Sequence, residues 1–336
     1  MLRYVVSRLG VAVVMALLAT LVIFLIANTV PGDPVLAQLG DVAASNKEFV
    51  ALWRAKYGLD LPLWERYFVF LKGLVHGDLG ISIASQRPVL DDIEQFAPAT
   101  IELASVGFLL SIVIGIPLGI LAAVRRDSWI DHAARLVSLV GVSSPTFWLA
   151  FIMLAVFYGG LQIAPGPGRL DPIAFPPPTV TGLYLIDTLL AGDLSAFRDA
   201  AAHLVLPSLV LAAATLGLIT RTTRASMLES MQQDYVRMAR AKGLKEVHIV
   251  IGHVLPNALI PVVTLGGLAY ANLLTGAVMT ETVFSWPGLG RYTFRSAAAL
   301  DFPAIMGITL IVAVTYLVIN LLIDFSYALL DPRVVR

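Results

Sequence analysis

The chain has 336 residues, of which 58% are hydrophobic and 14% are charged, and its formal net charge is zero. Soluble domains are typically about 45–50% apolar and about 25% charged, so the composition excludes an ordinary soluble domain. The absence of cysteine excludes disulfides, thiolate metal sites and cysteine nucleophiles. With no net positive charge, the chain as a whole has no attraction for nucleic acid, and the composition indicates an integral membrane protein.

Six apolar segments are long enough to cross a bilayer as helices, which requires roughly 20 mostly apolar residues. They are continuous apolar runs, unlike the alternating strands of a membrane barrel, so we predict an all-α integral membrane protein with six transmembrane helices. The predicted spans are residues 9–30, 100–124, 136–158, 204–220, 258–280 and 304–330. Arg3 and Arg8 precede the first span, as basic residues precede the apolar core of a signal peptide. The span is longer than such a core, which has about 7–15 residues, and this length favours a retained transmembrane helix.

Basic residues predict the orientation, because they are concentrated near the cytoplasmic ends of membrane spans. In a six-span chain, the segments outside the spans lie alternately on the two sides of the membrane. The segments on one side hold thirteen Lys and Arg in 62 positions, and those on the other side hold ten in 137. The first side is therefore predicted to be cytoplasmic, together with both termini. The cytoplasmic segments are 1–8, 125–135, 221–257 and 331–336, and the outer segments are 31–99, 159–203 and 281–303.

Several spans contain helix-breaking residues, including Pro117, Ser144-Pro145, Pro207 and Pro261. Membrane helices tolerate proline where neighbouring groups or water satisfy the freed backbone. Ordinary kinks are one interpretation, and a bundle that must change shape is the other.

The cytoplasmic segment 221–257 has a helical pattern on each side of a glycine, with Arg237, Arg240, Lys242 and Lys245 around that glycine. The apolar positions are Met227, Met231, Tyr235 and Met238 before Gly243, and Leu244, Val247, Ile251 and Leu255 after it, up to Pro256. These spacings predict two short amphipathic helices joined at a glycine that can adopt a left-handed conformation. Such helices either lie on anionic lipid or dock on a soluble partner.

The same segment resembles the loop of permease subunits in bacterial ABC importers. That loop reads Glu-Ala-Ala, three residues, Gly, nine residues, Ile, one residue and Leu-Pro. The corresponding stretch is Asp234-Tyr235-Val236-Arg237-Met238-Ala239-Arg240-Ala241-Lys242-Gly243-Leu244, followed by Leu255-Pro256. Ala239, Gly243, Leu255 and Pro256 fall at the matching positions. Arg237, Met238 and His253 depart from the pattern, in the way that is characteristic of the peptide and nickel branch.

Further motifs extend the resemblance over nearly the whole chain. They are Arg8-Leu9, Pro31-Gly32-Asp33-Pro34, His76-Gly77-Asp78-Leu79-Gly80 and Glu281-Thr282-Val283-Phe284-Ser285-Trp286-Pro287-Gly288-Leu289-Gly290-Arg291. In this order they are similar to the dipeptide, oligopeptide and nickel importer permeases, and most similar to the first of the two membrane subunits of dipeptide systems.

The resemblance implies a type I ABC importer permease fold for di- or oligopeptide uptake in the bacterial inner membrane. It also implies a homologous second permease subunit, two cytoplasmic ATP-binding subunits and a periplasmic or lipid-anchored substrate-binding protein, all surrounded by membrane lipid. The loop residues Asp234, Tyr235, Arg237, Ala239, Arg240, Lys242, Gly243, Leu255 and Pro256 would couple the chain to the ATPases. No Gly-x-x-x-x-Gly-Lys-[Ser/Thr] motif occurs, so we expect no enzymatic activity and no cofactor in this chain.

The expected organisation has four parts: an N-terminal transmembrane helix (1–30), a periplasmic loop region (31–99), a five-helix transmembrane domain (100–330) that includes the coupling loop 221–257, and a cytoplasmic tail (331–336). Four polar residues near or within the spans are candidates for the transport pathway, because polar groups in membrane segments often mark function. They are Glu102, Tyr270, Asn272 and Glu281. Alternatively, the glutamates face interfacial water and Asn272 bonds a neighbouring helix.

The five histidines are scattered and form no His-Glu-x-x-His motif, so no metal site is expected. Within the importer class, nickel or glutathione are alternative solutes. A stand-alone channel or secondary transporter is the alternative of a different class. Secondary transporters often contain inverted repeats, and no such repeat is visible in this sequence.

Overall fold

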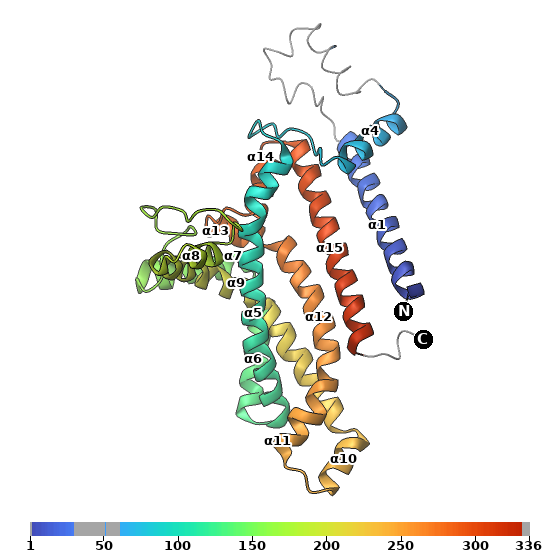
Figure 1. Ribbon diagram of the computed structural model, residues 1–336. Helices are drawn as coiled ribbons and strands as arrows, with labels where there is room; N and C mark the ends of the chain where they lie inside the picture. Colours follow the sequence, from blue (N-terminus) through green and yellow to red (C-terminus); the bar gives the residue numbers. More distant parts are fainter. Residues whose placement is uncertain (1, 30–50, 52–60, 331–336) are drawn as a thin grey trace. The chain divides into compact units, whose positions relative to one another are not determined.

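The computed structural model describes residues 2–29, 51 and 61–330, and these are almost entirely helical (Figure 1). The motif at 31–34 and the tail 331–336 lie outside the described residues. In the described part, the only extended pairing is an isolated antiparallel bridge between Ile81 and Pro88. The predicted all-α class is confirmed.

The chain divides into two compact units, and the first consists of Met1–Ala97 with Gly288–Val318. Its helices are α1 (Leu2–Thr29), α4 (Leu63–Val75), the first turns of α5 (Val89–Val124), α14 (Leu289–Ala298) and α15 (Phe302–Leu330) as far as Val318. A small core joins α5, α14 and α15 through Val89, Ile93, Tyr292, Ala304 and Ile308. Helix α1 contacts α4 through the hydroxyls of Thr20 and Tyr67, 2.9 Å apart.

Buried aspartates fix the loop that precedes α5 in this unit. Asp301 accepts a hydrogen bond from the hydroxyl of Ser82 at 2.6 Å. Asp92 accepts from Ser85 at 2.5 Å and from the phenol of Tyr292 at 3.0 Å. Burial, together with the bond to Asp92, raises the pKa of Tyr292, which keeps the phenol a neutral donor. Residues 82–85 are therefore tied to Asp301, in the connection between α14 and α15, and through Asp92 to Tyr292 of α14.

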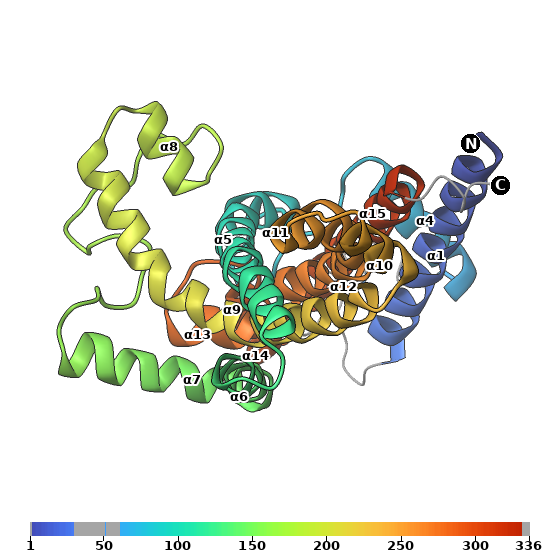
Figure 2. The ribbon, with the colours of Figure 1, turned by 90° about the horizontal axis from the view of Figure 1, so that it is seen from below.

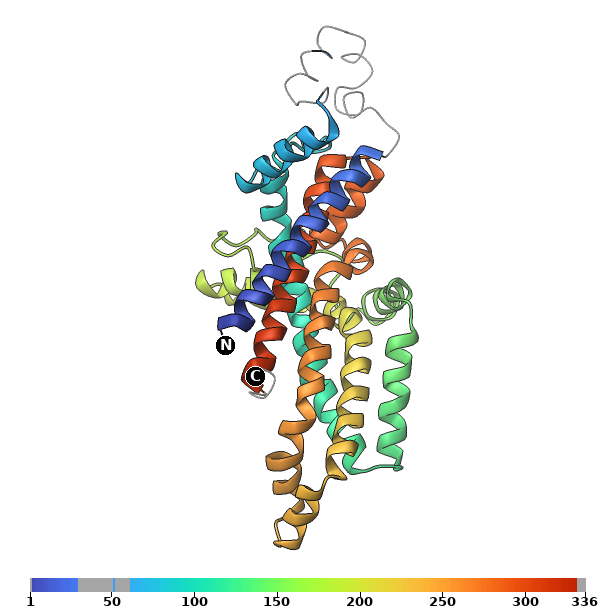
Figure 3. The ribbon, with the colours of Figure 1, turned by 90° about the vertical axis from the view of Figure 1, so that its right-hand side faces the viewer.

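The second unit consists of Pro98–Pro287 with Ile319–Arg336. Besides the rest of α5 and α15, its elements are α6 (Trp129–Ser143), α7 (Thr146–Met153), the π-helix η1 (Leu154–Gly160), α8 (Tyr184–Leu190), α9 (Leu194–Met231), α10 (Asp234–Ala241), α11 (Glu246–Ile249), the π-helix η2 (Val250–Val254), α12 (Leu255–Gly276) and α13 (Val278–Val283). Its helices α6 and α9 lie side by side (Figures 2 and 3). A Cβ on Gly217 would lie 2.5 Å from the carbonyl oxygen of Ser138, so this glycine permits the close approach of α6 to α9.

Five of the described helices are long and apolar enough to cross a membrane. Helix α6 and the α7–η1 segment form a bent pair, which makes a sixth span when the two are counted together. The five are α1, α5, α9, the α11–α12 stretch and α15, which contain the predicted spans 9–30, 100–124, 204–220, 258–280 and 304–330 in whole or in large part. The chain is therefore a multi-pass membrane protein.

The predicted span 136–158 is broken at the helix-breaking residues read from the sequence, because α6 and the α7–η1 segment meet at 106°. Ser144 has an extended conformation (φ −78°, ψ 127°), and Pro145 follows it. Proline disfavours a helical conformation at the residue before it and cannot donate a backbone hydrogen bond, which ends α6 at this point. The helix that contains the predicted span 204–220 is longer than the span, since α9 has 38 residues and continues to Met231.

Candidate functional site

Gly243 forms the bend of the candidate coupling loop. It has φ +75°, the left-handed conformation that the sequence suggested for this glycine. Its N–H donates to the carbonyl of Arg240 at 2.9 Å, and the N–H of Leu244 donates to the carbonyl of Ala239 at 3.3 Å. This pair of bonds is a Schellman motif, which ends α10 and satisfies its last carbonyls. The bend is therefore a defined structure that requires a left-handed residue.

The helices around the bend differ from the predicted ones. Met227 and Met231 belong to α9, whereas Tyr235 and Met238 belong to α10, and the chain leaves the helix between them at Gln232. The predicted single helix over 227–238 is thus wrong. Pro256 does not end the second helix but lies near the start of α12, which continues directly from η2.

The loop has an inner apolar face that packs against the bundle. This face belongs to a core cluster that also includes residues of α5, α9 and α12. The buried members of this cluster are Ala123, Met227, Val236, Ala239, Ile249, Val250, Val254 and Ala258. Because the same cluster joins the loop to three long helices, a displacement of the loop would also displace the ends of those helices.

A second apolar face of the loop is exposed, and we call it the outer face. It consists of Tyr235, Met238, Leu244, Val247 and Ile251, whose exposed fractions are 37%, 59%, 42%, 68% and 60%. These residues make up most of the apolar pattern read from the sequence. The pattern correctly indicated amphipathic helices, but these five residues are exposed. The bundle contacts Val236 and Ala239, together with the other pattern residues Met227, Met231 and Leu255.

Charged groups surround the bend without covering the outer face. The guanidinium of Arg240 contacts the carboxylate of Glu246 at 2.7 Å, and this pair joins α10 to α11 across Gly243. Arg237 pairs with Asp234 at 3.3 Å. Exposed pairs of this kind typically contribute about 0–1 kcal/mol, so the bend depends more on its backbone hydrogen bonds than on them.

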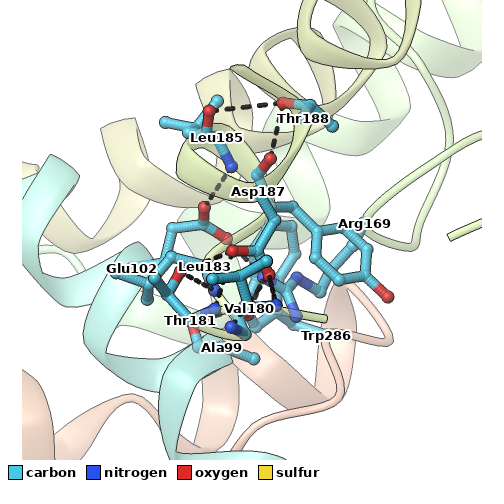
Figure 4. Close-up of polar contacts among 12 residues, drawn as sticks. Ala99, Glu102, Arg169, Val180, Thr181, Leu183, Leu185, Asp187, Thr188 and Trp286 are labelled. Carbon is cyan, nitrogen blue, oxygen red and sulfur yellow. Dashed lines mark hydrogen bonds and ion pairs between the residues drawn. The ribbon is translucent and has the colours of Figure 1, made fainter. Parts of the chain in front are cut away.

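Two of the pathway candidates, Glu102 and Glu281, are buried with partners in the second unit. Glu102 is 4% exposed and forms a 2.6 Å ion pair with Arg169, and it also accepts from the N–H of Leu185 at 2.8 Å (Figure 4). Glu281 is fully buried and accepts from the hydroxyl of Thr100 at 2.6 Å. The alternative in which both glutamates face interfacial water is therefore wrong.

Arg169 is the residue of this region that the sequence analysis missed. It is 9% exposed, its guanidinium lies 3.5 Å from the ring centroid of Tyr184, and it donates to the carbonyl of Gly182 at 3.1 Å. Trp286, whose ring lies 5.6 Å away, donates to the carbonyl of Ala99 at 2.8 Å. A single arginine in a proline- and glycine-rich loop gives no sequence signal for a partner 67 positions earlier.

Asp187 organises the loop on the other side of Arg169. Its carboxylate accepts from the N–H and hydroxyl of Thr181 at 2.8 and 2.7 Å and from the N–H of Gly182 at 2.9 Å. Burial alone would raise the pKa of Asp187, but these bonds outweigh it and hold the pKa below its usual value. The loop that carries Arg169 is therefore an ordered structure.

The other two pathway candidates lie on α12. The hydroxyls of Tyr270 and Ser105 are 2.9 Å apart, and the Tyr270 ring packs on Phe108 with 5.1 Å between centroids. Asn272 is exposed, two positions further along the helix. The structure therefore does not gather the four candidates into one cluster, and their role in a pathway stays a prediction.

The helical fold and the multiple spans define a multi-pass membrane protein, and its loop between α9 and α12 has two apolar faces. Residues 115–336 match the family described as binding-protein-dependent transport system inner membrane component, and residues 1–104 match the N-terminal part of such membrane components. The chain belongs to this family, which is a membrane component of transport systems and not a catalytic subunit. The resemblance inferred from the sequence is confirmed.

Relatives of known name cover almost the whole chain. The chain is 48% identical over 313 residues to the probable D,D-dipeptide transport system permease protein DdpB of Escherichia coli K12, covering 93% of this chain and 92% of the relative. It is 40% identical over 336 residues to the dipeptide transport system permease protein DppB of the same strain, covering 99% of each. It is 39% identical over 334 residues to the di/tripeptide permease protein DppB of Pseudomonas aeruginosa UCBPP-PA14, again covering 99% of each.

A solved structure supports the fold. The chain is similar to a chain of the MetNI methionine ABC transporter in inward-facing conformations, with a TM-score of 0.50, 18% identity, and coverage of 71% of this chain and 96% of that chain. At this identity the likeness concerns the fold alone. It agrees with the predicted permease fold of an ABC importer.

Proposed function

We propose that the chain is a permease subunit that forms part of the pathway for di- or oligopeptides through the bacterial inner membrane. A homologous second permease subunit would complete the pathway, two cytoplasmic ATPases would drive it, and a periplasmic or lipid-anchored binding protein would deliver the peptide. The names of the relatives support this solute class, since they match over almost the full length of both chains.

We further propose that the chain is organised as the sequence suggested. Residues 1–30 would be the N-terminal transmembrane helix, 31–99 the periplasmic region, 100–330 the transmembrane domain and 331–336 the cytoplasmic tail. The separate family matches over 1–104 and 115–336 support a boundary near residue 100.

The observation that carries the coupling role is the outer face of the loop. Tyr235 and Met238 lie three positions apart on α10, and Val247 and Ile251 lie four positions apart after the bend, so each pair shares a helix face. Exposed apolar faces of this kind support the binding of another molecule. Met231 lies 11 residues beyond the apolar stretch 204–220, or about 16 Å along the helix at 1.5 Å per residue. The headgroup layer on each side of a bilayer is only about 5–8 Å thick. With 204–220 as the membrane span, the loop after Met231 would lie past the lipid, which favours an ATPase over a lipid surface as the partner.

The solute is tested on the purified assembly of all subunits reconstituted in lipid. A dipeptide should stimulate ATP hydrolysis above the basal rate in the presence of the binding protein, and nickel or glutathione should not. Stimulation by nickel or glutathione alone would contradict the peptide assignment. Ion flux through the reconstituted chain without ATP would favour the stand-alone channel instead.

The identity of 48% to the D,D-dipeptide permease favours a second candidate, in which the peptides have D-configured residues. The two candidates differ only in stereochemistry. D-Ala-D-Ala and L-Ala-L-Ala have the same composition and charge, so they form a matched pair for the same ATPase assay. A preference of tenfold or more for one of them decides between the candidates.

A further inference from the structure

A pocket of about 420 Å³ lies between α6 and α9 in the second unit. Its volume falls within the roughly 300–1,000 Å³ typical of ligand sites. Leu139, Val142 and Gly217 line one part of it, and Arg135 and Arg221 line another. The pocket therefore has an apolar part and a basic part, as the binding site of an amphipathic molecule would.

The basic part has more positive than negative charge. Asp131 is fully buried and accepts two bonds from Arg224, at 2.6 and 2.8 Å, and two from Arg135, at 3.1 and 2.8 Å. One carboxylate thus serves two guanidinium groups, and Asp127 adds a longer contact of 3.7 Å to Arg135. Within the described part of the chain, Arg221 has no carboxylate within 4 Å. It is exposed and lines the pocket.

The position of the basic part suggests the source of the ligand. Trp129 begins α6 and is 78% exposed, and tryptophan is enriched at the level of the lipid headgroups. Arg135 follows six residues later, about 9 Å along the helix. The charge distribution of the sequence assigns this end to the cytoplasmic leaflet, which carries the anionic lipids.

We propose that this pocket binds one anionic phospholipid of the cytoplasmic leaflet. The phosphate would lie against Arg221 and Arg135, and an acyl chain would cover Leu139 and Val142. Inorganic phosphate would leave the apolar part empty, and a neutral lipid would leave Arg221 without a counter-charge. The bound lipid would then brace α6 against α9.

The test uses the complete transporter in a neutral detergent and counts retained lipids by native mass spectrometry. Phosphatidylglycerol and phosphatidylcholine with identical acyl chains are the two probes. We expect one tightly retained phosphatidylglycerol and no equivalent phosphatidylcholine. Arg221→Gln should lower retention about fivefold, the attraction of one basic residue for an anionic membrane surface. Leu139→Trp should also lower it by filling the apolar part, and this side chain is 64% exposed, so the fold should tolerate the change.

Arg125→Gln is the matched control, because it removes the same charge on the same side from an exposed residue that does not line the pocket. Arg126 is unsuitable, since it pairs with Asp127, which contacts Arg135. The control should retain phosphatidylglycerol like the wild type. Equal retention of the two lipids, or equal effects of Arg221→Gln and Arg125→Gln, would overturn the proposal. Complete displacement by millimolar inorganic phosphate would instead indicate a free-anion site. If the Arg221→Gln transporter lost its second permease subunit but retained its lipid, the pocket would be a contact between subunits, and this would overturn the lipid proposal.

Discussion

Replacing Gly243 by valine should abolish peptide uptake while the protein still inserts into the membrane at near-normal levels. Gly243 has φ +75°, which L-residues adopt at a cost of roughly 1–2 kcal/mol and β-branched residues at a higher cost. A Cβ at this position meets no atom within 4 Å, so the penalty arises from the backbone alone. The inner face of the loop does not include Gly243, and for this reason insertion and folding should survive.

The magnitude predicts a graded series. A penalty of 1–2 kcal/mol lowers the equilibrium constant between the native bend and other loop conformations by about 5–30-fold, which is the expected range for Gly243→Ala. Gly243→Val should lower it further, whereas Gly243→Asn should stay near wild type because asparagine tolerates the left-handed conformation. Gly252→Ala is the matched control, since Gly252 lies in the same loop, also has free space around it and has no positive φ.

The assay combines peptide uptake by whole cells, membrane levels by immunoblot and co-purification of the ATPases. We expect lost uptake and lost ATPase association, or hydrolysis uncoupled from transport, with the binding protein still docking on the outside. Wild-type uptake by Gly243→Val at normal expression would refute the coupling role of the loop. An equal loss of uptake in Gly252→Ala would show that the defect does not depend on the bend.

Three further predictions concern the rest of the chain. Arg169→Met should destabilise the protein by about 3–5 kcal/mol, because it leaves Glu102 buried without its counter-charge. Thermal unfolding in detergent should then show a lower midpoint that Glu102→Gln partly restores, and an unchanged midpoint for Arg169→Met would contradict the structural role of the pair. A cysteine replacing Phe175, which is 90% exposed, should react with an impermeant thiol reagent in intact spheroplasts, and one replacing Lys245 should not. The reverse labelling pattern would exclude the six-span topology. The isolated subunit should neither bind nor hydrolyse ATP, since it lacks a phosphate-binding loop, and stoichiometric nucleotide binding measured by calorimetry would disprove this.

The sequence predicted the class and most spans because long apolar runs have one stable solution in a bilayer, the helix. It located the third span and its helix-breaking Pro145 but did not decide between a kink and a complete break. Only the packing of α6 and α7 on other helices distinguishes a kink from the observed 106° bend.

The loop shows a second limit of sequence reasoning. Periodicity identified amphipathic helices, but α10 has apolar residues on two sides, and its pattern did not reveal which side faces the bundle. Val236 and Ala239 are small and pack inward, while Tyr235 and Met238 remain outside. The Glu102–Arg169 pair was unpredictable for another reason, since it joins a helix to a distant irregular loop through contacts that no local pattern encodes.

Photo-crosslinking from the outer face tests the coupling role most directly. A photoreactive amino acid would replace Val247, which is 68% exposed, and in a control Phe175, on the predicted opposite side of the membrane. In the complete transporter, the group at position 247 should crosslink to an ATP-binding subunit, and the yield should change when ATP is added. Crosslinks from position 247 to lipid alone, with assembled and active ATPases present, would contradict the assignment of this surface as the ATPase-docking site.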